Sequence, residues 1–364
     1  MKRAVEILTT AIVWSAVAGY IVWASLLVHR HYETRRVGRM EIRISDSTSN
    51  GYFITQERVR TWISRNGLSA TGLRPEETDI AAIRRLIARN GFVGRADVYI
   101  TYSGDLHIDI ETRRPLMRLM TEGFDSYVTG EGFVFDAPEG SACHVPIVTG
   151  GYRPLFPAGF EGDTGDYADS LRLCAMRACL EIGEERDSLH GMMQQVRDTM
   201  RALRRQRTKK RLFESKQEFE ERQKQAAAER QAVLRGLDAD MRDLRHRVEE
   251  SDERERIVVA RQKKNEENYA DFLKLINFVR SVGDDGFWSA EIVQIIVSAT
   301  SYGGMDLTLV PRSGDFRIEF GETDGAQEKF ERLMKFYRDG LGCIGWDRFS
   351  TLNLKYDNQV VCTE

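Results

Sequence analysis

Two series of apolar residues at heptad spacing constrain this chain more than any other feature. The series are Leu189, Met193, Val196, Met200 and Leu203, followed by Leu234, Leu237, Met241, Leu244 and Val248. Alternating steps of three and four residues place such side chains on one helix face and are typical of coiled-coil packing. The sequence therefore predicts a helical coiled-coil insertion over residues 165–268.

The arrangement of these helices has more than one solution. Both ends of the insertion must return to the same domain, so the simplest solution is an antiparallel hairpin centred near Glu218. No glycine or proline lies between Met192 and Arg235 to form its turn, so a single long helix or an intermolecular coiled coil stays open. The pattern identifies no particular partner for the insertion.

A basic run lies close to the expected turn. Its members are Arg201, Arg204, Arg205, Arg207, Lys209, Lys210 and Arg211. Such a run is most often a solvated helix surface, and it also suits contact with anionic lipid headgroups or an acidic partner. Acidic stretches at residues 218–221 and 249–255 allow neutralisation between the two arms as well.

The N-terminal end predicts a membrane anchor. No residue from Ile7 to Val28 is charged, and a helix of that length reaches ~33 Å, enough for the ~30 Å core of a bilayer. No small-residue cleavage site follows, so the segment is expected to remain as a transmembrane helix. Basic residues lie on both sides of it, and the charge rule therefore leaves its orientation open.

The segment after the anchor favours a small α+β domain over residues 39–113. The expected order is a strand (Met40–Ile44), a helix capped by Thr55, a helix ended by Asn90, and two strands (Ala96–Tyr102 and Leu106–Glu111). Strand, helix, helix, strand, strand directly after an anchor resembles a POTRA domain, which is a module of envelope assembly proteins.

Three short elements beyond this unit carry a more specific resemblance. They are Glu111–Pro115, the glycine-turned hairpin Thr129–Phe135, and Val145–Gly150. In this order they resemble the FtsQ/DivIB family of bacterial cell division proteins. Phe287–Ile295 is similar to the helix-to-strand step of the family in its Bacteroidetes-like members. The resemblance predicts a mixed β domain that the coiled-coil insertion interrupts.

The predicted fold class is α+β: one N-terminal transmembrane helix, a POTRA-like domain, and a mixed β domain with a helical insertion. The expected parts are a short cytoplasmic N-terminus (1–6), the transmembrane helix (7–28), the POTRA-like domain (39–113), the first part of the β domain (114–164), the coiled-coil insertion (165–268) and the second part of the β domain (269–364). The resemblance places the bulk of such a protein in the periplasm, on the cell inner membrane at the division septum. It implies a bitopic, non-enzymatic scaffold of the divisome.

The C-terminal end is the expected partner-binding site. Residues 350–361, with Leu352, Leu354 and Tyr356 alternating, predict a strand at a sheet edge that can accept another strand. In the family, this last strand region binds the FtsB–FtsL pair, and the POTRA domain helps recruitment by other division proteins. The residues that the resemblance assigns to partner binding are Leu354, Lys355, Tyr356, Asn358 and Val360.

Other classes of function find little support in the sequence. A formal net charge of −3 argues against a nucleic-acid-binding chain. The five cysteines include no CxxC pair, the six histidines are scattered, and no phosphate-binding or nucleophile motif is present. We therefore expect no catalytic residues, no cofactor and no metal. The alternatives are another POTRA-bearing envelope assembly protein or a membrane-tethered coiled-coil adaptor.

Overall fold

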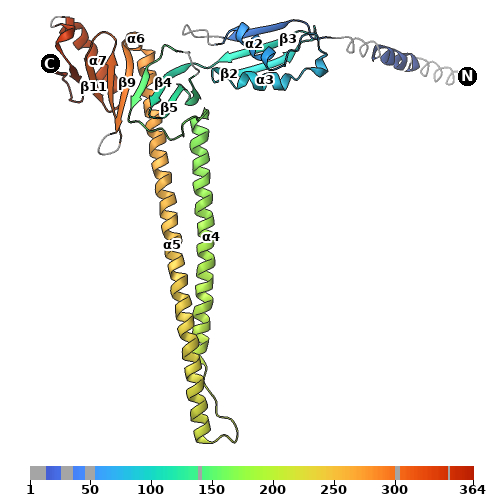
Figure 1. The fold of residues 1–364 in the computed structure, drawn as a ribbon, viewed down its shortest axis with the longest axis vertical. Coiled ribbons are helices and arrows are strands. Elements are labelled where there is room, and N and C mark those ends of the chain that lie inside the picture. The colour runs from blue at the N-terminus through green and yellow to red at the C-terminus, as the bar shows by residue number, and fades with distance from the viewer. Residues whose placement is uncertain (1–13, 26–35, 46–53, 138–141, 300–303, 343–344) are drawn as a thin grey trace, which may run out of the picture.

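The computed structural model of the protein describes residues 14–25, 36–45, 54–137, 142–299, 304–342 and 345–364. From residue 36 onward these residues form a small α+β unit, a larger β domain, and a long pair of helices that projects from the β domain (Figure 1). The α+β composition agrees with the sequence.

The predicted transmembrane helix over Ile7–Val28 is wrong. Among the residues that the structure describes, no helix combines the length and the apolar character needed to cross a membrane. Within the predicted range the structure describes residues 14–25 as helix. Residues 7–13 and 26–28 of that range lie outside the described residues.

The small unit packs two helices on one face of a three-stranded sheet. Its elements are β1 (Met40–Ser45), α2 (Gln56–Arg65), η1 (Pro75–Glu77), α3 (Ile80–Ala88), β2 (Val93–Ile100) and β3 (Leu106–Thr112), with strand order β1-β3-β2. Thr55 caps α2 by accepting from the backbone N–H of Arg58, and Asp79 caps α3 by accepting from that of Ala82. Alternate strand residues such as Ile108 are buried against both helices.

The β domain is built on a ten-stranded mixed sheet. Its strands are β4 (Pro115–Thr121), β5 (Phe124–Thr129), β6 (Phe133–Asp136), β7 (Ile147–Gly150), β8 (Gly162–Asp163), β9 (Ile292–Ala299), β10 (Met305–Pro311), β11 (Arg317–Gly321), β12 (Thr351–Asn353) and β13 (Val361–Thr363). The order is β13-β12-β11-β10-β9-β7-β4-β5-β6-β8, so β7 and β9 join the two halves of the sheet as a parallel pair. The shorter helical segments are α6 (Trp288–Glu291), α7 (Ala326–Lys335), η2 (Phe336–Leu341) and η3 (Trp346–Arg348).

The two long helices form an antiparallel hairpin between β8 and β9. They are α4 (Thr164–Arg205) and α5 (Lys216–Asp284), and they lie side by side along most of α4 (Figure 1). Arg186 pairs with Glu255 at 2.6 Å and with Asp252 at 3.2 Å, across a seam of buried residues that includes Leu189 and Leu244. Complementary charges beside an apolar seam fix the register of the two helices.

Helix α5 continues beyond residue 268, where the predicted insertion ends. Its last four turns carry Phe272, Leu275, Val279 and Val282, which are buried in the same core as the strands of the β domain. One uninterrupted helix therefore serves as an arm of the hairpin and as a core helix of the β domain.

A loop without glycine or proline, residues 206–215, connects the two helices. Phe213 takes a positive φ of 71°, a conformation that glycine usually supplies. Glu214 holds the loop by accepting from Arg222 Nε at 2.8 Å and from Arg222 Nη2 at 2.7 Å. Arg222 also donates to the backbone oxygen of Lys209 at 3.0 Å, and Ser215 caps α5. Side-chain hydrogen bonds thus replace the turn residues that the sequence lacks.

The Glu214 contacts predict that this loop opens in acid. Hydrogen bonds from Arg222 and from the backbone N–H of Arg211 lower the pKa of Glu214 from 4.5 to about 2. Because the folded-state pKa is depressed, the contribution to loop order is complete above pH ~4.5 and is lost as the pH falls toward ~2. We expect pepsin to cut between Leu212 and Phe213 faster at pH 2 than at pH 4, after normalisation to an unstructured substrate.

A Glu214→Gln variant provides the control for this acid effect. It cannot titrate, so its normalised cleavage rate should be the same at both pH values and faster than that of the original chain at pH 4. Helix content followed by circular dichroism must stay constant across the range. An original chain with no pH dependence, at constant helix content, would contradict the prediction.

The core of the small unit extends into the β domain. Tyr127 of β5 and Phe135 of β6 are fully buried in the same cluster as Phe92. The rings of Phe92 and Phe135 are in edge-to-face contact, with their centroids 5.0 Å apart. Arg113 lies over the Phe133 ring at 3.5 Å and donates to the backbone oxygen of Val93 at 2.6 Å. The two units therefore share an apolar junction rather than a flexible linker.

Candidate partner-binding edge

The strand predicted over residues 350–361 is instead two short strands joined by a turn. β12 ends at Asn353 and β13 begins at Val361, with the two paired antiparallel. Asn358 has a positive φ of 60°, which asparagine tolerates better than most residues. The turn therefore interrupts the apolar alternation after Leu354, and Tyr356 lies in the turn rather than on a strand.

The five sequence-predicted residues have different positions around this turn. Leu354 is fully buried, and Val360 is partly buried against the same core. Lys355 Nζ pairs with Asp306 at 2.8 Å, which ties the start of the turn to β10. Tyr356 is 54% exposed and Asn358 is exposed, so only these two present their side chains freely to solvent.

β13 is the edge strand of the sheet at this end. The backbone N–H of Leu354 donates to the oxygen of Glu319, so alternate residues of β12, Leu352 and Leu354, direct their backbone groups toward β11. The residues that flank Leu352, which are Asn353 and Thr351, pair with Val361 and Thr363 of β13. Because backbone groups alternate along a strand, those of Cys362 point away from β12 toward the open edge.

The edge is held at both ends by contacts that the sequence did not predict. Arg332 of α7 donates to the backbone oxygen of Tyr356 at 2.5 Å and to that of Gln359 at 3.4 Å. At the other end Ser350 Oγ donates to the oxygens of Thr363 at 3.2 Å and Glu364 at 3.1 Å. A strand held in place loses less conformational freedom when a partner binds.

Cys362 serves this edge through its backbone rather than through its thiol. Its side chain is partly buried against the core, and this burial raises the pKa of the thiol. A raised pKa favours the protonated form, which is a poor nucleophile and a poor metal ligand. Sequence reasoning missed this residue, although the Asp357-Asn358 turn signal could have located the second strand.

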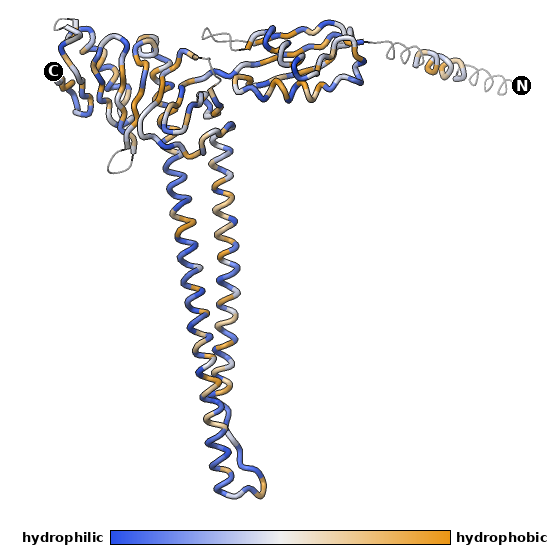
Figure 2. The backbone as a smooth tube through the Cα atoms, in the orientation of Figure 1, coloured by the Kyte–Doolittle hydropathy of each residue, from blue (hydrophilic) through white to orange (hydrophobic). Residues whose placement is uncertain are grey.

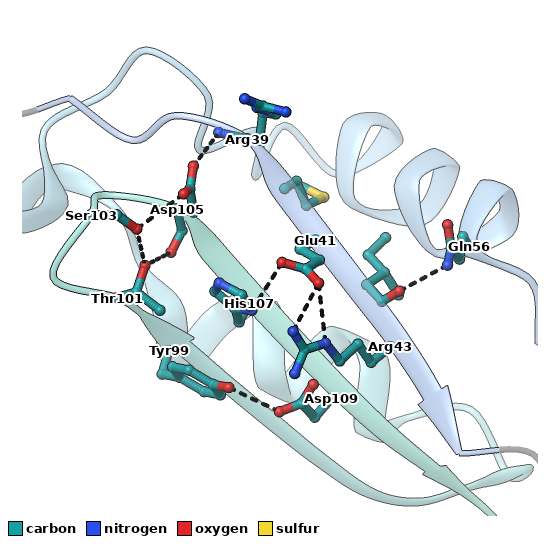
Figure 3. A network of polar contacts seen from close by, with 12 residues as sticks. Arg39, Glu41, Arg43, Gln56, Tyr99, Thr101, Ser103, Asp105, His107 and Asp109 are labelled. Carbon is teal, nitrogen blue, oxygen red and sulfur yellow. Dashed lines mark hydrogen bonds and ion pairs between the residues drawn. The ribbon is translucent and has the colours of Figure 1, made fainter.

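A second polar surface lies on the small unit (Figure 3). On the sheet face opposite Ile108, Glu41 pairs with Arg43 at 2.9 Å and lies 3.5 Å from the ring of His107. Tyr99 stacks on His107 and donates to Asp109 at 3.1 Å. These groups bond mainly to one another across the three strands, which is how cross-strand pairs stabilise a sheet.

The same surface is continued by the β2–β3 turn (Figure 3). Asp105 accepts from the backbone N–H of Arg39 at 3.0 Å and from Ser103 Oγ at 3.0 Å, and these hydrogen bonds lower the pKa of Asp105. The turn thereby fixes the start of β1 against β3. We interpret the polar pairs on this sheet face as contacts that stabilise the small unit. The β13 edge is the better candidate for partner binding.

Comparison with known protein families agrees with this architecture. A family model described as FtsQ/DivIB, C-terminal related matches residues 247–363, and a POTRA-like domain model matches residues 36–111. The first match begins within α5 and runs through β13, so it includes the candidate edge. The second covers β1 to β3. No curated protein matches the chain.

These matches identify the class of protein. Both domains are of a scaffold type rather than an enzymatic one, and together they indicate a scaffold of cell division. The two matches confirm the resemblance to the FtsQ/DivIB family that was inferred from the motifs. The family points to the division septum and to interaction with other division proteins. The Bacteroidetes-like form stays a prediction.

Proposed function

We propose that this protein is a non-enzymatic scaffold that links divisome proteins at the septum through its POTRA-like and β domains. The observation that carries the proposal is the β13 edge, which directs the backbone groups of Cys362 outward and is held in place by Arg332 and Ser350. An ordered, unpaired strand edge binds an extended segment through backbone hydrogen bonds.

The partner at this edge is an extended segment of a complex that resembles FtsB and FtsL. It adds as a further strand beside β13, and Cys362 exchanges backbone hydrogen bonds with it. Tyr356 and Asn358 contact the partner from the adjacent turn, since both are exposed. Leu354, Lys355 and Val360 position that turn through the core and through Asp306. Tyr356 has the amphipathic ring typical of interface anchors.

The location and division of labour follow from the same proposal. The protein works at the cell inner membrane of the septum, with its POTRA-like and β domains on the periplasmic side. Residues 39–113 serve recruitment by other division proteins, and the two parts of the β domain, 114–164 and 269–364, serve partner binding. The hairpin, within 165–268, is an addition to this scaffold.

The edge hypothesis predicts that Cys362→Pro weakens binding of the FtsB–FtsL pair from the same cell by about fivefold or more. Proline removes the outward N–H and leaves a partner carbonyl unpaired, which costs ~1–3 kcal/mol, while the hydrogen bonds of Val361 and Thr363 to β12 remain. Calorimetric titration of the purified chain with the purified pair measures the change.

Cys362→Val is the matched control, because it changes the same side chain and keeps the N–H. It should bind within about twofold of the original chain. Both variants must show the thermal unfolding of the original chain, since proline is tolerated at a strand edge. A correctly folded Cys362→Pro variant with unchanged affinity would rule out strand addition at β13 and shift attention to the hairpin.

A further inference from the structure

The far end of the hairpin exposes two large apolar side chains. Leu212 is 90% exposed and Phe213 is fully exposed in the loop between α4 and α5. Figure 2 shows a short hydrophobic stretch at this end, between hydrophilic stretches of the two helices. Large apolar groups are rarely left fully exposed without a partner, and adjacent ones mark an interaction site. We call residues 206–215 the tip loop.

Hydrogen bonds at both ends of the tip loop order its backbone, so the exposure of Leu212 and Phe213 follows from the structure of the loop. Glu214 follows Phe213 directly and accepts from Arg222 Nε and Nη2, while Arg230 donates to the backbone oxygen of Gln206 at the other end. Phe213 adopts a left-handed φ of 71°, which is unfavourable for a bulky side chain. Costly conformations of this kind persist where the surroundings enforce them, often at functional sites. The loop thus presents both side chains outward from an ordered base.

The tip loop is also strongly basic. Around the apolar pair lie Arg204, Arg205, Arg207, Lys209, Lys210, Arg211 and Lys216. The nearest carboxylate, Glu214, is already paired with Arg222. The surface that meets Leu212 and Phe213 must therefore be apolar at the point of contact and anionic around it.

We infer that the tip loop binds the surface of an anionic lipid bilayer. Leu212 and Phe213 enter the region of the headgroups and upper acyl chains, and the surrounding lysine and arginine residues contact lipid phosphates. An apolar point within a basic ring suits a bilayer interface, which accepts convex shapes without a preformed pocket. A protein partner would need a groove that matches both side chains and an acidic rim.

The hairpin gives this contact a defined reach. Between Lys216 at the tip and Phe272 in the core of the β domain, α5 runs without a break. These residues span ~84 Å at the helical rise of ~1.5 Å per residue. Contact at one small tip is weak and reversible by itself, and its attachment to a scaffold supplies the rest of the binding.

Trypsin cleavage of the full chain tests the inference. The basic residues of the non-helical tip loop are the expected first sites, so their cleavage reports on that loop alone. We expect vesicles of equal parts phosphatidylglycerol and phosphatidylcholine to slow this cleavage severalfold. Vesicles of phosphatidylcholine alone should leave it unchanged, and high salt should reduce the protection because it screens the lysine and arginine charges.

Two variants make the result specific. The double variant Leu212→Ser with Phe213→Ser should be cleaved as fast with anionic vesicles as without lipid. Leu180→Ser removes a leucine that is 63% exposed on α4 and should keep the protection. Residues outside the tip are the same in the original chain and in the double variant, so any affinity of those residues for lipid contributes equally to both. Protection by neutral vesicles, or protection that survives in the double variant, would overturn the inference, as would protection by polyglutamate alone.

Discussion

A Phe135→Ala variant is expected to lose ~3–5 kcal/mol of unfolding free energy and to uncouple the POTRA-like unit from the β domain. Phe135 belongs to β6 of the β domain, yet its fully buried ring packs on Phe92 and lies over Gly91. Truncation to alanine removes a large buried ring and leaves a cavity at the junction, which accounts for the magnitude.

The shape of the unfolding curve separates a junction effect from simple destabilisation. In the original chain the shared cluster makes the two units unfold together, whereas in Phe135→Ala we expect two resolved transitions in denaturant. Phe272→Ala is the matched control, since Phe272 is equally buried but lies in the other core. It should lose a similar free energy in a single transition. A single transition in both variants would show that Phe135 is only a local core residue.

Gly150→Ala is expected to cost more than ~3 kcal/mol, although it adds a single methyl group. Gly150 ends β7 at a φ of 105°, where a Cβ would lie 2.3 Å from the backbone oxygen of Val297 and 3.0 Å from its nitrogen. A backbone atom of a paired strand cannot move aside as a flexible side chain can. The substitution must therefore strain Gly150 or separate β7 from β9.

The adjacent glycine supplies the control for this effect. A Cβ at Gly151 meets nothing within 4 Å, so Gly151→Ala should change the free energy of unfolding by less than ~0.5 kcal/mol. Denaturant titrations of the two variants beside the original chain measure both values. Equal and small effects at the two positions would mean that the sheet does not depend on close contact between β7 and β9.

Local sequence signals predicted the helices and strands better than the contacts and connections between them. Thr55 caps α2 where the sequence placed it, because an N-cap acts within three residues. The heptad series predicted long helices, but the point where α5 passes from the hairpin into the core carries no break signal. The junction of Phe92 with Phe135 depends on a contact between two units, and no local pattern encodes it.

The candidate site shows the same limit. The sequence placed partner binding at the C-terminal end, but it treated two strands as one because Leu352, Leu354 and Tyr356 alternate. The positive φ of Asn358 reverses the chain, so the free edge moves from the region of Tyr356 to Cys362. Arg332 was not predictable as a support, since α7 approaches the turn only through tertiary packing.

The hairpin has a consequence for how the chain reaches its native state. Thr149 of β7 and Ile296 of β9 are neighbours across the parallel pair in the middle of the sheet. In the sequence, however, the two longest helices, α4 and α5, lie between them. Closing so long a loop from an unstructured chain would be entropically slow. If α4 and α5 pair first, starting from the tip loop, the loop that remains to be closed between β7 and β9 consists only of the short segments at the base of the hairpin. The hairpin would then set the order of folding, bringing the two halves of the sheet together as a late step.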